Sequence, residues 1–447
     1  MRFWLTAALA AIAPTGAHAE TLQQALTAAY ESNPTLQAAR AQSRAADEGL
    51  VQARSGFLPS ISANGAYTDR VTKTTVEPVG GAAAVTSKTN IEPRSYGVQA
   101  VQPLFTGGRL IAQTRQASAS IELNQEALRA TEQGVLLQAI AAYVDVRRDE
   151  ESVRIQVSNV NVLSRQLQAA RDRFEVGEIT RTDVAQAQAR LAGAEANLAA
   201  ARSNLEASRA VYAEIIGRPP EALEAPPAAP TLPASLDEAI DVATESNPDF
   251  IRLQQAERIA REQVRIEFAG LLPQVSIVGR MDRLYDQQAR GIESDVSSAT
   301  AQVSIPLYEG GFYRSRVRQA RDRLAQARAQ TEAVRRNVVS AVTSAWNDVQ
   351  ATQRVIVASR EQERAAALAL EGAEQELQVG LRTTLDVLDA QQELFNAQLA
   401  VVRAERDAYV AAHALLQATG KLEPRAVGVN APLYDPDKHR RAVRYRF

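Results

Sequence analysis

The sequence predicts a mainly α-helical chain of long antiparallel coiled-coil helices that also contributes four strands to a transmembrane β-barrel. Three observations predict this fold. Aromatic residues make up only 5% of the 447 residues, while Ala, Gln, Arg and Glu dominate long tracts, a mixture typical of long helices packed through small side chains. Four short segments alternate between apolar and polar residues. The whole pattern occurs twice along the chain.

The chain consists of two similar halves. Thr21–Pro34 matches Ser235–Pro248, and both segments end in Glu-Ser-Asn-Pro. Further along, 102–108 matches 305–311, and both contain Pro-Leu, an aromatic residue and Gly-Gly. A proline-rich segment between the halves is expected to be an extended linker. We therefore predict a signal peptide at 1–19, a first repeat at 20–217, the linker at 218–234, a second repeat at 235–422 and a C-terminal tail at 423–447, either packed or disordered.

Each half is predicted to run helix, two strands, long helix, short helix. In the first half, Thr21 caps a helix that continues to about Ser55 and is interrupted at Asn33, because the residue before proline disfavours helix. The long helix is expected at 109–174, where roughly 1.5 Å per residue gives a length of about 95–100 Å. A short helix follows at 182–216, and the second long helix is expected at 312–377.

The predicted strands have one apolar and one polar face. An ordinary half-buried sheet is the alternative, but these strands carry few bulky residues for a soluble core, and apolar-out, polar-in alternation is typical of a membrane barrel. Four strands cannot enclose a pore, so closure requires several chains. In the first half, a loop of about 20 residues is expected between the strands. The apolar positions are Ile61, Ala63, Gly65, Tyr67, Tyr96, Val98, Ala100, Val275, Ile277, Gly279, Met281, Ala299, Ala301, Val303 and Ile305.

Composition argues against an enzyme. The chain contains no cysteine, and three histidines far apart in sequence give no basis for a metal or catalytic cluster. No glycine-rich phosphate loop is present, so no cofactor is expected. A formal net charge of -2 gives no reason to expect a nucleic-acid partner.

The N-terminus has the three regions of a secretory signal. Arg2 precedes an apolar run at 3–13, and small residues flank His18. We predict cleavage after Ala19, which makes Glu20 the first mature residue. A membrane anchor is the alternative, but the run is shorter than the about 20 apolar residues that a spanning helix needs. The protein is therefore expected to be exported.

These residues together resemble the TolC-type outer-membrane factors of Gram-negative bacteria. The resemblance covers residues 20 to about 422, and it rests on the paired Glu-Ser-Asn-Pro helices, the Pro-Leu-aromatic-x-Gly-Gly junctions, the Val-Gly turns and the segment 385–390. It implies a homotrimer in the cell outer membrane, in which helices continue a barrel of about twelve strands as a periplasmic α-barrel. It further implies an exit duct for small-molecule efflux or type I protein secretion that works with a periplasmic adaptor and an inner-membrane transporter. Outer-membrane lipid would surround the strands.

The resemblance also implies a function for the acidic segment. Asp386 and Asp389 are three residues apart and share a helix face. By themselves they favour the simpler interpretation of two solvated surface aspartates, and it is the resemblance that reverses this preference. In a trimer each becomes a ring of three carboxylates at the periplasmic entrance, which favours cations and, through crowding, raises the pKa of the ring.

The two turns are expected to close this entrance and to dock the adaptor. Thr182, Asp183 and Arg382 match the family's latch positions, and an Asp183–Arg382 contact would be charge-assisted. Leu377 stands where better-known members carry a latch tyrosine. The turns themselves also suffice as simple helix-hairpin connections. The expected docking residues are Val176, Gly177, Val379, Gly380, Leu381 and Thr383.

The main alternative to a duct is an exported periplasmic structural coiled-coil protein without a channel. Such a protein would account for the helices and the signal. It would not account for four alternating strands at duplicated positions. The sequence does not distinguish drug efflux from protein secretion, because the transporter chooses the cargo.

Overall fold

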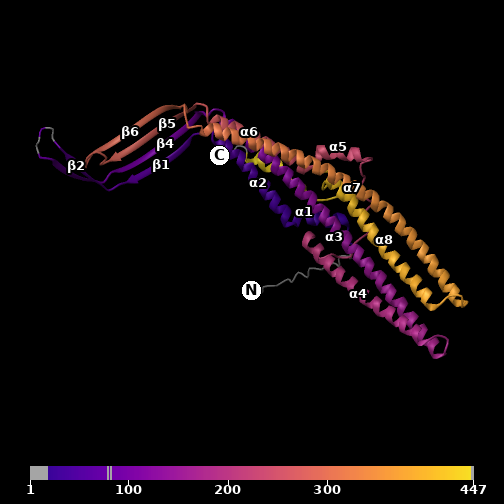
Figure 1. Cartoon of the computed structure of the whole chain (residues 1–447). Coiled ribbons are helices and arrows are strands. Elements are labelled where there is room, and N and C mark those ends of the chain that lie inside the picture. The colour runs from indigo at the N-terminus through magenta and orange to yellow at the C-terminus, as the bar shows by residue number, and fades with distance from the viewer. Residues whose placement is uncertain (1–18, 78–79, 81–82, 444–447) are drawn as a thin grey trace, which may run out of the picture. The chain divides into compact units, whose positions relative to one another are not determined.

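The computed structural model describes residues 19–77, 80 and 83–443 (Figure 1). The predicted signal peptide up to residue 18 and the last four residues lie outside this range. The described elements form two compact units. The elements are α1 (Leu22–Ser32), α2 (Pro34–Ser55), β1 (Ser60–Tyr67), β2 (Arg70–Val76), β3 (Val85–Ile91), β4 (Arg94–Phe105), α3 (Arg109–Glu175), α4 (Arg181–Ile216), α5 (Leu236–Ser246), α6 (Pro248–Ala269), β5 (Gln274–Tyr285), β6 (Glu293–Ser304), α7 (Phe312–Gln378), α8 (Thr384–Ala418) and α9 (Pro436–Val443).

The break between the first two helices confirms the expectation at Asn33-Pro34. Thr21 caps α1 by accepting a hydrogen bond from Gln24, whose side chain bonds back to the Thr21 backbone. Asn33 leaves the helical conformation, and its side-chain oxygen accepts hydrogen bonds from the first backbone N–H groups of α2. Pro34 begins α2, where its missing N–H costs nothing.

The second half repeats this break with the same contacts. Asn247 separates α5 from α6 and caps α6 through its side-chain oxygen. The amide nitrogen of Asn33 donates to the carbonyl of Ile215 at the end of α4, at 3.1 Å. The amide nitrogen of Asn247 donates equivalently to Ala418 at the end of α8, at 2.9 Å. Each Asn-Pro break therefore holds the C-terminal end of the short helix in its own half.

The first unit is helical and comprises the described residues up to Ala41 together with Glu126–Ile251 and Val334–Tyr434. Its largest apolar core joins α1, α3 and α4 and includes the fully buried Tyr143 and Tyr212. A second core joins α5, α7 and α8. Within this unit, α3 returns as α4 and α7 returns as α8 after short turns (Figure 1).

The second unit contains all the strands and comprises Gln42–Gln125, Arg252–Ala333 and the residues from Asp435 on. Four of its strands form an antiparallel sheet in the order β1-β4-β5-β6. The segment expected to be a long loop contains two strands instead, since 70–76 and 85–91 pair as the two-stranded sheet β2-β3. These residues are rich in threonine and valine, which favour strands. The expectation of a loop gave too much weight to the glycines between them.

The strand-to-helix junctions follow the expected Gly-Gly pairs. Gly107, Gly108, Gly310 and Gly311 all have positive φ, a conformation that favours glycine. Strand β4 runs past Pro103 to Phe105, with a register shift between these two residues.

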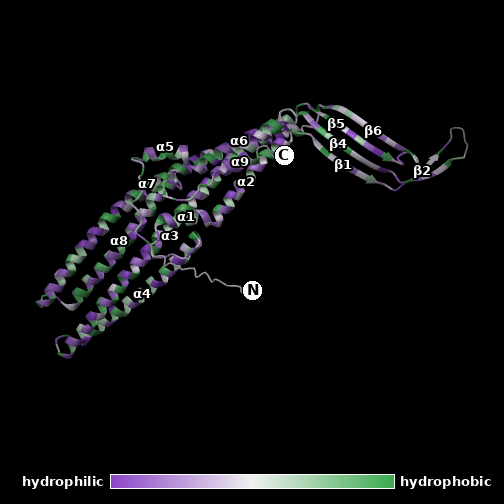
Figure 2. Cartoon of the chain, turned by 180° about the vertical axis from the view of Figure 1, so that it is seen from behind, coloured by the Kyte–Doolittle hydropathy of each residue, from purple (hydrophilic) through white to green (hydrophobic). Residues whose placement is uncertain are grey.

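Polar and apolar residues alternate along the helices, as Figure 2 shows. Within the described range, no helix is both long enough and apolar enough to cross a membrane.

Candidate functional site

Two similar turns join the helices of the first unit. Gly177 between α3 and α4 has φ +80, and Gly380 between α7 and α8 has φ +77. In each turn, backbone N–H groups bond back to the last carbonyls of the preceding helix, as in a glycine C-cap. The apolar side chains of Val176, Val379 and Leu381 are exposed by 69–78%. In a single chain, the apolar residues that the sequence suggested for docking are therefore accessible to a partner.

Each turn ends in a capping box that engages an acidic residue. Asp183 accepts hydrogen bonds from the backbone N–H and hydroxyl of Thr180, both at 2.8 Å. Asp386 does the same with Thr383, at 2.9 and 2.8 Å. These hydrogen bonds stabilise the carboxylate and hold the pKa of both aspartates below the usual value. Within one chain, the two residues are therefore helix caps.

The residues that the sequence suggested as a latch have other partners within the chain. Arg382 forms an ion pair with Glu376 at 2.7 Å, inside its own turn. Asp183 is engaged by Thr180, and Thr182 is exposed in the first turn of α4. In the part of the chain that the structure describes, no hydrogen bond or ion pair joins Asp183 to Arg382. Leu377, where the resemblance implied that better-known members carry a latch tyrosine, packs on the apolar cluster of Leu370, Ala373 and Val387 between α7 and α8.

The two aspartates that are expected at the entrance, Asp386 and Asp389, differ in their partners. Asp389 forms an ion pair with Arg190 of α4, with 2.6 Å between Nη2 and Oδ1. This contact joins residues 199 positions apart in sequence and links α4 to α8. Sequence reasoning missed Arg190. The available signal was its place seven residues after Asp183, on the same face of α4.

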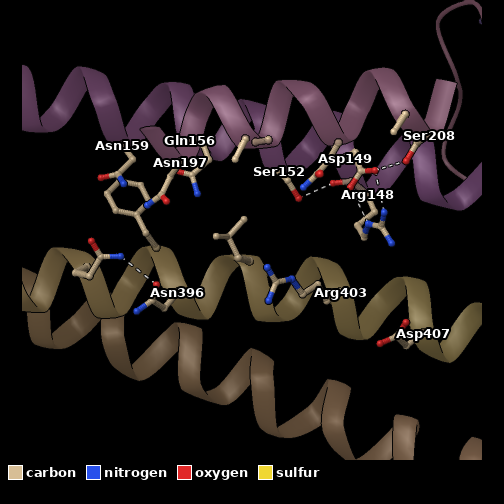
Figure 3. A pocket seen from close by; sticks show the side chains of 17 residues that line it. Arg148, Asp149, Ser152, Gln156, Asn159, Asn197, Ser208, Asn396, Arg403 and Asp407 are labelled. Carbon is tan, nitrogen blue, oxygen red and sulfur yellow. Dashed lines mark hydrogen bonds and ion pairs between the residues drawn. The ribbon is translucent and has the colours of Figure 1, made fainter. Parts of the chain in front are cut away.

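A polar cavity of about 670 Å³ lies between α8 and the α3–α4 pair (Figure 3). Arg148 donates two hydrogen bonds to the buried carboxylate of Asp149, which also accepts from Ser208. Gln156 and Asn159 have buried side-chain oxygens without a hydrogen-bond partner in the described chain. Outside the cavity, Arg406 of α8 pairs with Asp145 of α3 at 2.8 Å. The contact between α8 and α3 is thus largely polar at this level, a feature that the sequence analysis did not anticipate.

Comparison with known proteins places the chain in a family. The family model described as "Outer membrane efflux protein" matches residues 25–218 and 239–421. The outer membrane efflux protein BepC of Brucella suis is 35% identical over 95% of this chain and 91% of its own length. The outer membrane protein TolC of Vibrio cholerae is 28% identical over 93% of this chain and 94% of its own length.

Solved structures show the same fold. The outer membrane protein VceC from Vibrio cholerae aligns with a TM-score of 0.74 over 89% of this chain and 96% of that chain, at 21% identity. The Campylobacter jejuni CmeC outer membrane channel aligns with a TM-score of 0.78 over 94% of this chain and 88% of that chain, at 14% identity.

These findings agree with the mainly helical fold and the antiparallel strands, and they do not favour a structural coiled-coil protein without a channel. Members of the family are channel proteins rather than enzymes. The chain therefore belongs to the outer membrane efflux protein family and is a TolC-like efflux channel of the outer membrane.

Proposed function

We propose that the chain works as a homotrimer that forms an exit duct together with a periplasmic adaptor and an inner-membrane transporter. The observation that carries this proposal is the four-stranded sheet, in which β1 and β6 are edges without a partner strand among the described residues. Unpaired edges are a liability that closure removes. Three copies of the sheet, joined edge to edge, make a closed barrel of about twelve strands.

The exposure of the strands supports contact with outer-membrane lipid. Ile61, Val98, Met281 and Val303 are large apolar residues that are 49–73% exposed in the single chain. They come from all four strands of the sheet. A band of apolar side chains on one face of each strand matches the outer surface of a membrane barrel.

The cargo is proposed to be small molecules or proteins of a type I secretion pathway. Relatives with known names include the alkaline protease secretion protein AprF and the pyoverdine export outer membrane protein OpmQ, both from Pseudomonas aeruginosa. These names cover a protein and a small molecule, and both relatives are 25–26% identical to this chain. The similarity therefore supports an export duct of this class, but it does not identify one cargo.

The entrance is proposed to lie at the α7–α8 turn, where three copies of Asp386 and Asp389 form acidic rings. Because Asp183 and Arg382 have partners inside their own turns, the proposed latch with Thr182 acts between neighbouring chains, where Arg382 exchanges Glu376 for Asp183. Such an exposed contact is modest in strength, which suits a closure that a partner opens.

The proposed domain organisation follows the sequence halves, with a signal peptide at 1–19, repeats at 20–217 and 235–422, a linker at 218–234 and a tail at 423–447. The matching Asn-Pro contacts and capping boxes in the two halves support the repeat. In the tail, 436–443 forms the helix α9.

Crosslinking in the cell tests the proposed partners. A photo-reactive residue at Leu381 is expected to capture a periplasmic adaptor, because this side chain is 78% exposed at the α7–α8 turn. The same residue at Leu415, which is fully buried between helices, is the control and should capture none. The complex should migrate as a heat-sensitive trimer from the outer-membrane fraction. Monomers without adaptor adducts would contradict the proposal.

A further inference from the structure

We infer that Arg190 is a gating residue, which ties α4 to α8 through Asp389 and neutralises that acidic position while the entrance is closed. This inference rests on the proposed entrance and deepens it. It assigns different functions to the two aspartates. Asp386 supplies permanent negative charge, and Asp389 supplies charge only after the Arg190 contact has broken.

The geometry of the Arg190–Asp389 pair suits a contact that forms and breaks. The 2.6 Å distance is that of a short charge-assisted hydrogen bond. The side chains are 40% and 56% exposed, so water can replace either partner when the helices separate. A buried pair would be costly to break, whereas an exposed pair is modest in strength.

The pair lies beside the apolar contact that joins the two helical hairpins. Leu388 precedes Asp389 on α8 and packs with Leu163 of α3 and Ala194 of α4. Ala194 is four residues after Arg190, so the two lie on one face of α4. Movement of α8 away from α4 therefore disrupts this small cluster and the ion pair together. Within a single chain, by contrast, the Arg382–Glu376 pair lies inside one turn and does not join the two hairpins.

The two aspartates differ in the charged groups that contact them. Thr383 engages Asp386 through uncharged donors. Arg382 acts on Asp386 through space but forms its ion pair with Glu376, so the Asp386 carboxylate has no ion-pair partner of its own. The guanidinium of Arg190 cancels the charge of Asp389. In a trimer, the closed entrance then carries one uncompensated ring of three carboxylates, and opening adds a second ring. The preference for cations should rise as the channel opens.

Single-channel recording of the purified trimer in lipid bilayers tests Arg190. We expect Arg190→Gln to increase the open-to-closed ratio about twofold to fivefold for each pair lost, as for an exposed ion pair. We also expect its reversal potential in a salt gradient to shift toward that of a more cation-selective channel, because Asp389 is uncompensated. Arg364→Gln is the matched control, since it removes the same charge from an exposed pair, Arg364–Glu361, that lies within α7 alone.

Two further variants separate the possible outcomes. Asp389→Asn should open the channel as Arg190→Gln does, but without the gain in cation preference. The exchange variant Arg190→Glu/Asp389→Arg should restore the wild-type open-to-closed ratio. Arg190→Gln could match wild type in both the open-to-closed ratio and the reversal potential, while Asp386→Asn lowers cation preference. That result would support the proposed entrance and show that Arg190 is not a gating residue. If Asp386→Asn has no effect, the proposed entrance itself is wrong.

The absence of cysteine allows a test of the contact that does not depend on selectivity. In the double variant Arg190→Cys/Asp389→Cys, the two introduced thiols are the only ones in the chain. A short, reducible bifunctional crosslinker should join them within one chain and hold the channel closed until the link is reduced. Failure to crosslink, or a link that leaves opening unchanged, would show that this contact does not control opening.

Discussion

Asp386 and Asp389 are one helical turn apart, but different groups bind their carboxylates. Two uncharged donors of Thr383 bind the Asp386 carboxylate, whereas a guanidinium binds Asp389. Their spacing on one helix face was evident from the sequence. Their partners were not, because Arg190 lies on another helix.

The pH dependence of cation preference distinguishes two opposing effects on the pKa of Asp386. Hydrogen bonds from Thr383 lower the pKa of Asp386 from its ordinary value, whereas crowding in a trimeric ring raises this pKa. We expect the hydrogen bonds to prevail, so that cation preference is constant from about pH 7 to about pH 5 and is lost as pH falls through the lowered pKa. The stability contributed by the cap has the same sign: it is present above the unfolded pKa and is lost as pH falls through the folded pKa.

Reversal potentials measured across this pH range provide the test. Thr383→Val removes the hydroxyl donor with little change in volume and should move the loss of selectivity to higher pH. Titration of the wild-type channel well above about pH 5 would mean that crowding dominates.

At the scale of elements, caps and breaks define where each helix begins and ends. Thr180 and Thr383 begin α4 and α8 with the same capping box, and Gly177 and Gly380 provide the left-handed residue before each. These are local interactions within a few residues. For that reason the sequence located the long helices to within about one residue, which is the accuracy with which such ends can be defined.

The tail helix α9 is held by a contact that is distant in sequence. His439 Nδ1 lies 3.0 Å from the carboxylate of Asp47 on α2, and Asp47 is 1% exposed. Gln125 of α3 also donates to Asp437, at 3.2 Å. Burial raises the pKa of Asp47, which reflects the cost of placing this carboxylate away from water.

Removal of the histidine should release α9. We expect His439→Ala to destabilise the docked helix by about 1–3 kcal/mol, because a buried carboxylate loses its partner. Hydrogen exchange of the α9 amides measures this effect. In an Asp47→Asn background, His439→Ala should destabilise α9 less. Arg441→Ala, which removes an exposed ion pair with Asp435, is the control. Equal exchange in all variants would show that α9 does not depend on this contact.

At the scale of the whole molecule, one buried residue joins Glu20, the first residue after the predicted cleavage site, to the linker. The hydroxyl of Tyr143 on α3 lies 2.8 Å from the carbonyl oxygens of both Glu20 and Glu224. Glu20 also pairs with the linker backbone at Ala222 and Glu224. Arg218 forms an ion pair with the buried Glu20 side chain at 2.6 Å. Glu20 and the proline-rich linker are thus fixed on the same helix.

Tyr143→Phe tests this connection. We expect a loss of about 1–3 kcal/mol in the free energy of unfolding, because two carbonyl groups lose a shared donor in a buried site. Denaturant unfolding of the solubilised protein, followed by tryptophan fluorescence, measures the loss. Tyr308→Phe removes a hydroxyl from a side chain that is 88% exposed and should have no effect. If the two variants were equally stable, the hydroxyl of Tyr143 would not fix the linker.

The division into compact units also belongs to this scale. Each unit takes segments from both sequence halves, because α3 and α7 contribute residues to both units. Repeats in the sequence and compact units in space are therefore different descriptions of this chain. Helices α2 and α6 also contribute residues to both units.

The sequence by itself determined the helices, the Asn-Pro breaks, the four-stranded sheet and the turns at Gly177 and Gly380. These features depend on local chemistry: caps, proline, glycine and the period of apolar residues. The tertiary structure alone decided that Arg190 meets Asp389, that Tyr143 binds Glu20 and Glu224, and that 70–76 pairs with 85–91. Those contacts depend on how the helices are rotated and which strands align. Arg190 and Asp389, for example, are 199 positions apart and come together only when the chain has folded.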